Sequence, residues 1–244
     1  GQADIIAELA FPLPFDVISE MLGMPAGDTE ALRSWSEDIV KTIDPIITED
    51  EIKAAVIANR AMDEYMAGVI EWKRENPGDD LLTAMIEAEE DGDKMSSKEL
   101  SDQVSLLFIA GHETTVNLIG TGIADLLSRP DQAQSIRDNG LEMNGVDELL
   151  RFVSPVQMSR RITTRDVAID GRDIPSGTMV MAALASANRD ANKWGPNANE
   201  LDLGREGAGQ HLSFGSGIHY CLGASLAKLE GQVAIGSFIQ RFPN

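Results

Sequence analysis

Cysteine is almost absent from this sequence. The 244 residues include a single cysteine, Cys221. One cysteine cannot form a disulfide within the chain, and proteins that depend on disulfides belong mainly to oxidising compartments. We therefore expect a protein of the reducing cytoplasm.

Basic residues and long apolar runs are scarce as well. Twenty Lys and Arg stand against forty Asp and Glu, which gives a formal net charge of -20. The resulting field repels phosphates, so it argues against a nucleic-acid or anionic-membrane binder. No stretch has the length of a membrane span or the charged start and apolar run of a signal peptide. We expect no nucleic-acid partner and no membrane span.

Helical spacing of apolar residues dominates the first part of the chain. It is clear in "GQADIIAELAFPLPFDVISEMLGMP", in residues 52–72 and in residues 81–88. A shorter helix holds "DELLRF" and ends before Pro155. The first 154 residues therefore read as the α-rich part.

Alternation of apolar and polar residues follows in "RITTRDVAIDGRDIPSGTMVMAAL". Asp170-Gly171 and Ser176-Gly177 are turn signals within it, which predicts a small β region. The last part holds another helix, with Leu222, Leu226, Leu229 and Val233 on one face. No linker separates these parts, so we expect one domain over residues 1–244. Its parts are an α-rich part at 1–154, a β region and loop at 155–210, and a cysteine-containing loop with the final helix at 211–244.

One long helix is predicted in the centre of the chain. Ser96 and Glu99 form a capping-box pattern at its start, and Pro130 stops the apolar-rich run that follows. Its middle, "GHETT" at residues 111–115, interrupts the apolar stripe with a glycine, two ionisable groups and two hydroxyls. A glycine within a helix costs about 0.5–1 kcal/mol relative to alanine. Such conflicts are typical of functional sites.

The single cysteine lies in "HLSFGSGIHYCLG", residues 211–223, which we call the cysteine loop. A lone cysteine is most often a small buried apolar residue. Here it stands where the last helix begins, so amide N–H groups such as those of Leu222 and Gly223 can stabilise a thiolate. The glycines of the loop also let a flat ligand approach the backbone. The pattern favours a thiolate that binds a ligand.

Two other chemistries are disfavoured. A cysteine nucleophile would need His211 or His219 as its base, but His219 is only two residues away and no third orienting group stands out. Zinc would need a second histidine where "HETTV" has Val116, and one cysteine cannot make a cysteine-rich site.

Glu148 and Arg151 stand three residues apart on a predicted helix. A solvated pair at this spacing contributes only about 0.2–0.5 kcal/mol and is common by chance. Taken alone, the pair indicates nothing more than a helix surface.

Taken together, these motifs resemble those of the cytochrome P-450 family, the haem-thiolate monooxygenases. The family's haem signature is Phe-x-x-Gly-x-His/Arg-x-Cys-x-Gly, its oxygen-activation motif is Ala-Gly-x-Asp/Glu-Thr, and its structural pair is Glu-x-x-Arg. The matching residues are Phe214, Gly215, Gly217, His219, Cys221 and Gly223 for the first, Ala110, Gly111, Glu113 and Thr114 for the second, and Glu148 and Arg151 for the third. The resemblance covers essentially the whole chain. It implies a mainly α, cytochrome P-450-like fold with a small β region, and a fragment incomplete at both ends because members of the family are longer.

The resemblance also implies a cofactor and residue roles. The cofactor is haem b, with Cys221 as the thiolate ligand of the iron. Ala110 and Gly111 on the long helix and Phe214, Gly215 and Gly223 in the cysteine loop surround the haem, whose propionates are bound by Arg161, His211 and His219. Glu113 and Thr114 are the catalytic residues and deliver protons to bound O₂.

Glu148 and Arg151 become a structural pair in this setting. Many relatives add an arginine to it from a later loop. Glu200 stands near that position in this sequence, and Arg205 is the possible substitute.

The function implied is monooxygenation: one oxygen atom of O₂ enters a small or medium apolar organic substrate, with electrons from a ferredoxin-type or flavin redox partner. A peroxide-driven peroxygenase is an alternative, disfavoured because Glu113 and Thr114 are both present. A non-catalytic haem-thiolate sensor or carrier is the alternative from another class.

Overall fold

The computed structural model describes residues 2–27, 29–44, 46–90 and 95–242. It consists of two compact units, Gly1–Val116 and Asn117–Asn244, and each is described here by itself. The boundary falls within the long helix α5, Ser97–Leu127. None of the helices in the described ranges has the length and apolar content needed to cross a bilayer.

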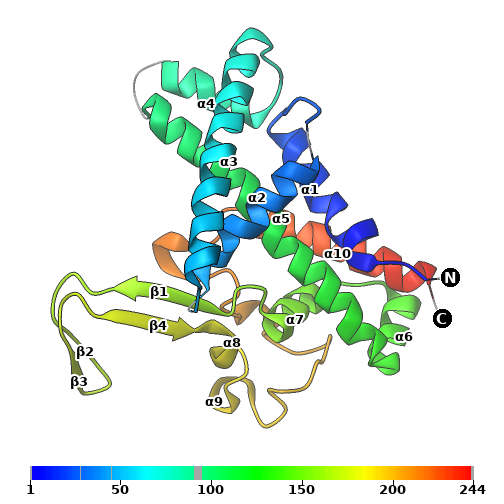
Figure 1. Ribbon diagram of the computed structural model, residues 1–244. Coiled ribbons are helices and arrows are strands. Elements are labelled where there is room, and N and C mark those ends of the chain that lie inside the picture. The colour runs from blue at the N-terminus through cyan, green and yellow to red at the C-terminus, as the bar shows by residue number, and fades with distance from the viewer. Residues whose placement is uncertain (1, 28, 45, 91–94, 243–244) are drawn as a thin grey trace. The chain divides into compact units, whose positions relative to one another are not determined.

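The first unit is helical (Figure 1). The sequence-predicted helices at 52–72 and 81–88 are confirmed, and each lies within one α-helix of this unit. Its elements are η1 (Ile6–Ala10), α1 (Pro12–Met21), α2 (Thr29–Val40), η2 (Lys41–Ile43), α3 (Glu49–Glu75), α4 (Leu81–Glu90) and the first part of α5.

Side-chain caps fix where two of these helices begin. In α3 the Thr48 hydroxyl accepts from the Glu51 amide, and the Glu51 carboxylate accepts from the Thr48 amide at 2.8 Å. Before α5 the Ser96 amide donates to Glu99 Oε2 at 2.8 Å, and the Glu99 amide donates to Ser96 Oγ at 3.3 Å. The predicted capping box of the central helix is confirmed, and both caps satisfy amides that a helix start leaves unpaired.

Apolar side chains from every α-helix of the first unit form its core. Edge-on contacts between aromatic rings are part of it, with Phe15 and Phe108 at 5.4 Å between ring centres. The buried members are Phe11, Phe15, Ile18, Leu22, Leu32, Met62, Met66, Val69, Ile70, Leu82, Ile86, Leu100, Val104 and Phe108.

Gly111 marks a close approach between α1 and α5. A Cβ atom at this position would lie 2.7 Å from Cγ1 of Ile18, which is buried. Any side chain here would therefore push α1 away from α5. The interruption of the apolar stripe at Gly111 thus has a packing reason within the first unit.

The second unit combines helices with two small antiparallel sheets (Figure 1). Strand β1 pairs with β4, and β2 pairs with β3. Its elements after α5 are α6 (Pro130–Asn139), α7 (Met143–Val153), β1 (Met158–Ile162), β2 (Val167–Ile169), β3 (Arg172–Ile174), β4 (Met179–Ala183), α8 (Leu184–Ala187), α9 (Ala191–Trp194), η3 (Ala208–Gln210), η4 (Gly217–His219) and α10 (Ala224–Arg241).

The predicted turns of the β region are confirmed. Asp170 and Gly171 join β2 to β3 with φ angles of 49° and 72°. Positive φ at both positions is what a tight hairpin turn requires, and Asp-Gly tolerates it. Gly177, at φ 81°, turns the chain before β4. The fold class, mainly α with a small β region, is therefore confirmed.

The final helix buries a different face from the apolar one seen in the sequence. Leu229 and Val233 are exposed, whereas Ala234, Ile235 and Ile239 are buried. Helix α10 packs against α6 and α7 with this second face. Both faces carry apolar residues, so periodicity could not tell which one packs.

Two glycines within helices of the first unit should respond oppositely to replacement by alanine. A Cβ at Gly68 in α3 meets nothing within 4 Å, so Gly68→Ala should raise the free energy of unfolding by about 0.5–1 kcal/mol. Gly111→Ala should lower it by about 1–3 kcal/mol because the methyl group overpacks against Ile18. Urea unfolding of both variants measures the difference. Equal stabilisation would show that α1 and α5 do not need the gap at Gly111.

Candidate functional site

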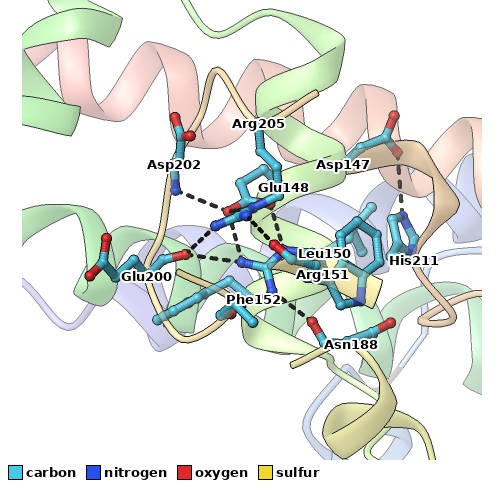
Figure 2. A network of polar contacts seen from close by, with 12 residues as sticks. Asp147, Glu148, Leu150, Arg151, Phe152, Asn188, Glu200, Asp202, Arg205 and His211 are labelled. Carbon is cyan, nitrogen blue, oxygen red and sulfur yellow. Dashed lines mark hydrogen bonds and ion pairs between the residues drawn. The ribbon is translucent and has the colours of Figure 1, made fainter. Parts of the chain in front are cut away.

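Glu148 and Arg151 of α7 form a buried ion pair in the second unit, and Arg205 joins them (Figure 2). Arg151 donates two hydrogen bonds to the Glu148 carboxylate: Nε is 2.7 Å from Oε2 and Nη2 is 2.9 Å from Oε1. Arg205 Nε lies 3.0 and 3.1 Å from the two carboxylate oxygens. The side chains of Glu148 and Arg151 are wholly buried. We call these three residues the Glu148 network.

The two arginines also bind backbone carbonyl groups of the following loop. Arg151 donates to the carbonyls of Asn188 and Ala198 at 2.6 and 2.8 Å. Both arginines donate to the carbonyl of Glu200 at 3.0 Å (Figure 2). Glu200 contributes only this carbonyl, and its own side chain is exposed. Arg205, and not the residue at 200, supplies the third charged group.

Asn188 extends this arrangement to the start of the cysteine loop. Its Nδ2 donates to the hydroxyls of Ser154 and Ser213 at 2.9 and 3.0 Å, and its Oδ1 accepts from the Leu212 amide at 2.8 Å. The Ser213 hydroxyl donates to the Leu150 carbonyl of α7 at 2.7 Å. Sequence reasoning missed Asn188, whose only signal is its place in "ASANRD".

His211 has both ring nitrogens engaged within the second unit. Its Nδ1 accepts from the Ser213 amide at 3.1 Å, so the proton of the neutral ring is on Nε2, which faces Asp147 Oδ1 at 3.4 Å. Lys228 of α10 holds the same carboxylate, with Nζ 2.7 Å from Oδ1. Both ring nitrogens thus face groups of the second unit. These contacts tie the start of the cysteine loop to α7, and propionate binding by His211 stays a prediction.

Cys221 is exposed, unlike the small buried residue that a lone cysteine usually is. Its amide donates to the Phe214 carbonyl at 2.9 Å, which closes the loop between them. Gly215 and Gly217 take φ angles of 72° and 69°, the left-handed conformation that favours glycine. The backbone turn that presents the thiol therefore depends on these two glycines.

The surface around the thiol fits a flat apolar cofactor. Ile218 and Leu222 are 97% and 89% exposed, which is unusual for two large apolar side chains in one loop. A Cβ atom at Gly217 or Gly223 would meet nothing within 4 Å, so the backbone is open to close approach. A thiol flanked by apolar side chains and bare backbone has the chemistry of a haem-thiolate site.

Helix α10 begins at Ala224, three residues after Cys221. Among the described residues, the amides of Leu222 and Gly223 donate to no carbonyl or side chain. They are therefore available to a sulfur anion, as the sequence suggested.

An exposed guanidinium group and an exposed imidazole also belong to the second unit. Arg161 lies on β1, and its Nη1 donates to Ser159 Oγ and to the Arg160 carbonyl, each at 2.7 Å. His219 is exposed at the end of η4. Both remain accessible to an anionic group.

The remaining candidates, Ala110, Gly111, Glu113 and Thr114, lie on α5 in the first unit. The Thr114 hydroxyl makes a long hydrogen bond of 3.4 Å to the Ala110 carbonyl. Glu113 has a side chain that is 17% exposed, with Oε1 3.5 Å from Nε2 of His112. The structure thus gathers a hydroxyl, a carboxyl and an imidazole on one stretch of helix.

His211 should make stability depend on pH. Burial lowers its pKa below the usual value, and this effect outweighs the attraction of Asp147, which acts in the opposite direction. In the unfolded chain His211 takes up a proton near pH ~6.5, whereas in the folded chain it stays neutral to lower pH. The free energy of unfolding therefore falls as the pH drops below about 6.5. Urea unfolding at about pH 7.5 and pH 5.5 should show a larger loss for the wild type than for His211→Gln. Equal losses would contradict the assignment.

Comparison with known proteins agrees with the motifs. The chain matches the family described as Cytochrome P450 over residues 4–145 and 143–243. It is 44% identical over 246 residues to cytochrome P450 107B1 of Saccharopolyspora erythraea, a match that covers 100% of this chain and 58% of that protein. It is 46% identical over 242 residues to the vitamin D(3) 25-hydroxylase of Pseudonocardia autotrophica, covering 97% of this chain and 57% of that one.

Solved structures agree as well. CYP109E1 of Bacillus megaterium in complex with testosterone superposes with a TM-score of 0.91 at 33% identity, covering 99% of this chain and 63% of that one. The chain therefore spans less than two thirds of the length of these relatives. The match of sequence and fold along nearly the whole chain confirms the resemblance inferred from the motifs, and the chain belongs to the cytochrome P450 family.

Proposed function

We propose that this chain carries the haem-thiolate centre of a monooxygenase, with b-type haem as cofactor and Cys221 as the ligand of its iron. The observation that carries the proposal is the exposed Cys221 thiol within an apolar, glycine-containing loop. Membership of the cytochrome P450 family supports it. When bound, a thiolate-ligated haem supplies the activation of O₂ for oxygen transfer.

The chain's own residues would hold this cofactor in three ways. The amides of Leu222 and Gly223 stabilise the Cys221 thiolate. The Arg161 guanidinium and the His219 imidazole are accessible groups for the two propionates, whose charge must be matched when they leave water. Phe214, Gly215 and Gly223 in the loop and Ala110 and Gly111 on α5 are assigned to the walls of the cofactor site. His211, which also ties the loop to Asp147, is assigned to a propionate as well.

Glu113 and Thr114 are assigned to proton delivery. Oxygen transfer consumes protons, and a carboxyl group followed by a hydroxyl on one helix can pass them from solvent to the reacting centre. The partial exposure of the Glu113 side chain supports such a path. A peroxide-driven enzyme would need no such pair, and a haem sensor or carrier would form no product.

We assign the substrate to the small or medium apolar organic molecules. The vitamin D(3) 25-hydroxylase and the testosterone complex among the relatives favour steroid-like compounds within this class. Electrons would come from a ferredoxin-type or flavin partner in the cytoplasm, and O₂ is the second substrate.

Cys221 can be tested by the spectrum of the haem-loaded protein. After reduction and addition of carbon monoxide, the wild type should show the red-shifted Soret band of a thiolate-bound adduct. Cys221→Ala should lose this shift because no thiolate remains, and His219→Gln, which leaves the ligand in place, should retain it. An unshifted band in the wild type, or a shifted one in Cys221→Ala, would refute the assignment.

A further inference from the structure

His112 is a buried titratable residue to which the proposed function assigns no role. Its ring is wholly buried on α5. The rings of Phe11, Phe15 and Phe108 surround it, with centres 5.9, 5.6 and 5.0 Å away. Three phenyl rings therefore form its surroundings.

The contacts of the ring determine where its proton lies. Nδ1 is 2.7 Å from the Phe108 carbonyl oxygen, which has no proton, so Nδ1–H must donate to it. The neutral ring then carries a lone pair on Nε2. This atom is buried and has no hydrogen-bond partner among the described residues. It lies 3.5 Å from Glu113 Oε1.

We propose that His112 is a positioning residue for Glu113, whose carboxyl group donates a hydrogen bond to Nε2 each time it takes up a proton. The proposal rests on the proposed function, in which Glu113 relays protons. When the carboxyl group is ionised, two acceptor atoms face each other and repel. A proton from solvent forms the O–H bond of the carboxyl group, and a small rotation of Glu113 brings that O–H to Nε2.

The hydrogen bond to Nε2 forms only while the carboxyl group carries a proton, because the ionised carboxylate has no proton to donate. Both residues of this hydrogen bond belong to the first unit. The hydrogen bond from Nδ1–H to the Phe108 carbonyl fixes the orientation of the ring. His112 thereby orients the protonated carboxyl group of Glu113, the residue directly before Thr114.

The tautomer of His112 is directly measurable. The chain contains three histidines, so nitrogen NMR of protein labelled in histidine can assign each ring with one variant per position. We expect His112 as the Nδ1–H tautomer and His211 as the Nε2–H tautomer, which serves as the internal contrast. His112 with its proton on Nε2 would overturn the proposal, because that atom could no longer accept.

The effect on Glu113 requires a second measurement. Infrared difference spectra between the wild type and Glu113→Gln isolate the band of the Glu113 carboxyl group as pH is varied. In His112→Asn the side-chain amide can still donate to the Phe108 carbonyl, but no atom replaces Nε2. The proton affinity of Glu113 should fall about two- to tenfold, the factor expected for one lost hydrogen bond.

Phe15→Leu is the matched control, because it changes the packing around the ring and keeps Nε2. It should leave the titration of Glu113 unchanged. An unchanged titration in His112→Asn would overturn the proposal. If the tautomer and the titration agree with it while Glu113→Gln turns over like the wild type, the positioning contact stands and the relay role of Glu113 is what fails.

Discussion

The buried carboxylate of Glu148 is the constraint on which the second unit depends. A charge without water costs several kcal/mol unless it is paired and hydrogen-bonded. Arg151 and Arg205 both bind it, and the Asp202 amide donates to it at 2.9 Å. Two guanidinium groups and one carboxylate leave one excess positive charge, which the carbonyls of the loop oppose. These hydrogen bonds to the arginines hold the loop against α7.

The position of the cysteine loop depends on the Glu148 network. The loop around the arginines includes the Asn188 carbonyl, and the Asn188 side chain binds Ser213 at the start of the cysteine loop. His211 adds a second tie, through Asp147, to α7. Cys221 itself makes local backbone contacts, to the Phe214 carbonyl and to the Ala224 amide. Buried polar groups that are distant from Cys221 in the sequence therefore determine where the exposed thiol lies.

Local signals made the elements predictable from sequence. Capping residues, proline stops and the Asp170-Gly171 turn act within a few residues, so their effects can be read without the fold. The buried face of α10 could not be read, because Leu229 and Ile235 are equally apolar and only packing selects between them. The packing reason for Gly111 depends on Ile18, which is distant in sequence.

The candidate site was predictable in identity but not in geometry. The glycine-cysteine loop and the Glu148–Arg151 pair were visible as motifs, whereas the participation of Arg205 depends on a loop that returns to α7. The contacts that tie His211 to Asp147 and to the Ser213 amide could not be read from the sequence, because they depend on the tertiary fold. Asn188 had no chemical signature, since a single asparagine in a polar stretch predicts only a turn.

Hydrogen exchange and urea unfolding of Glu148→Gln and Arg205→Gln test the central claim most directly. Arg205→Gln leaves the Glu148–Arg151 pair intact, whereas Glu148→Gln leaves two buried guanidinium groups without an anion. Both should destabilise the protein, with about 3–5 kcal/mol for Glu148→Gln as the larger loss. In both, the Asp202 and Leu212 amides should exchange faster than in the wild type. Glu37→Gln, which breaks the exposed pair with Arg33, should cost at most about 1 kcal/mol. Wild-type exchange and stability in Glu148→Gln would contradict the account.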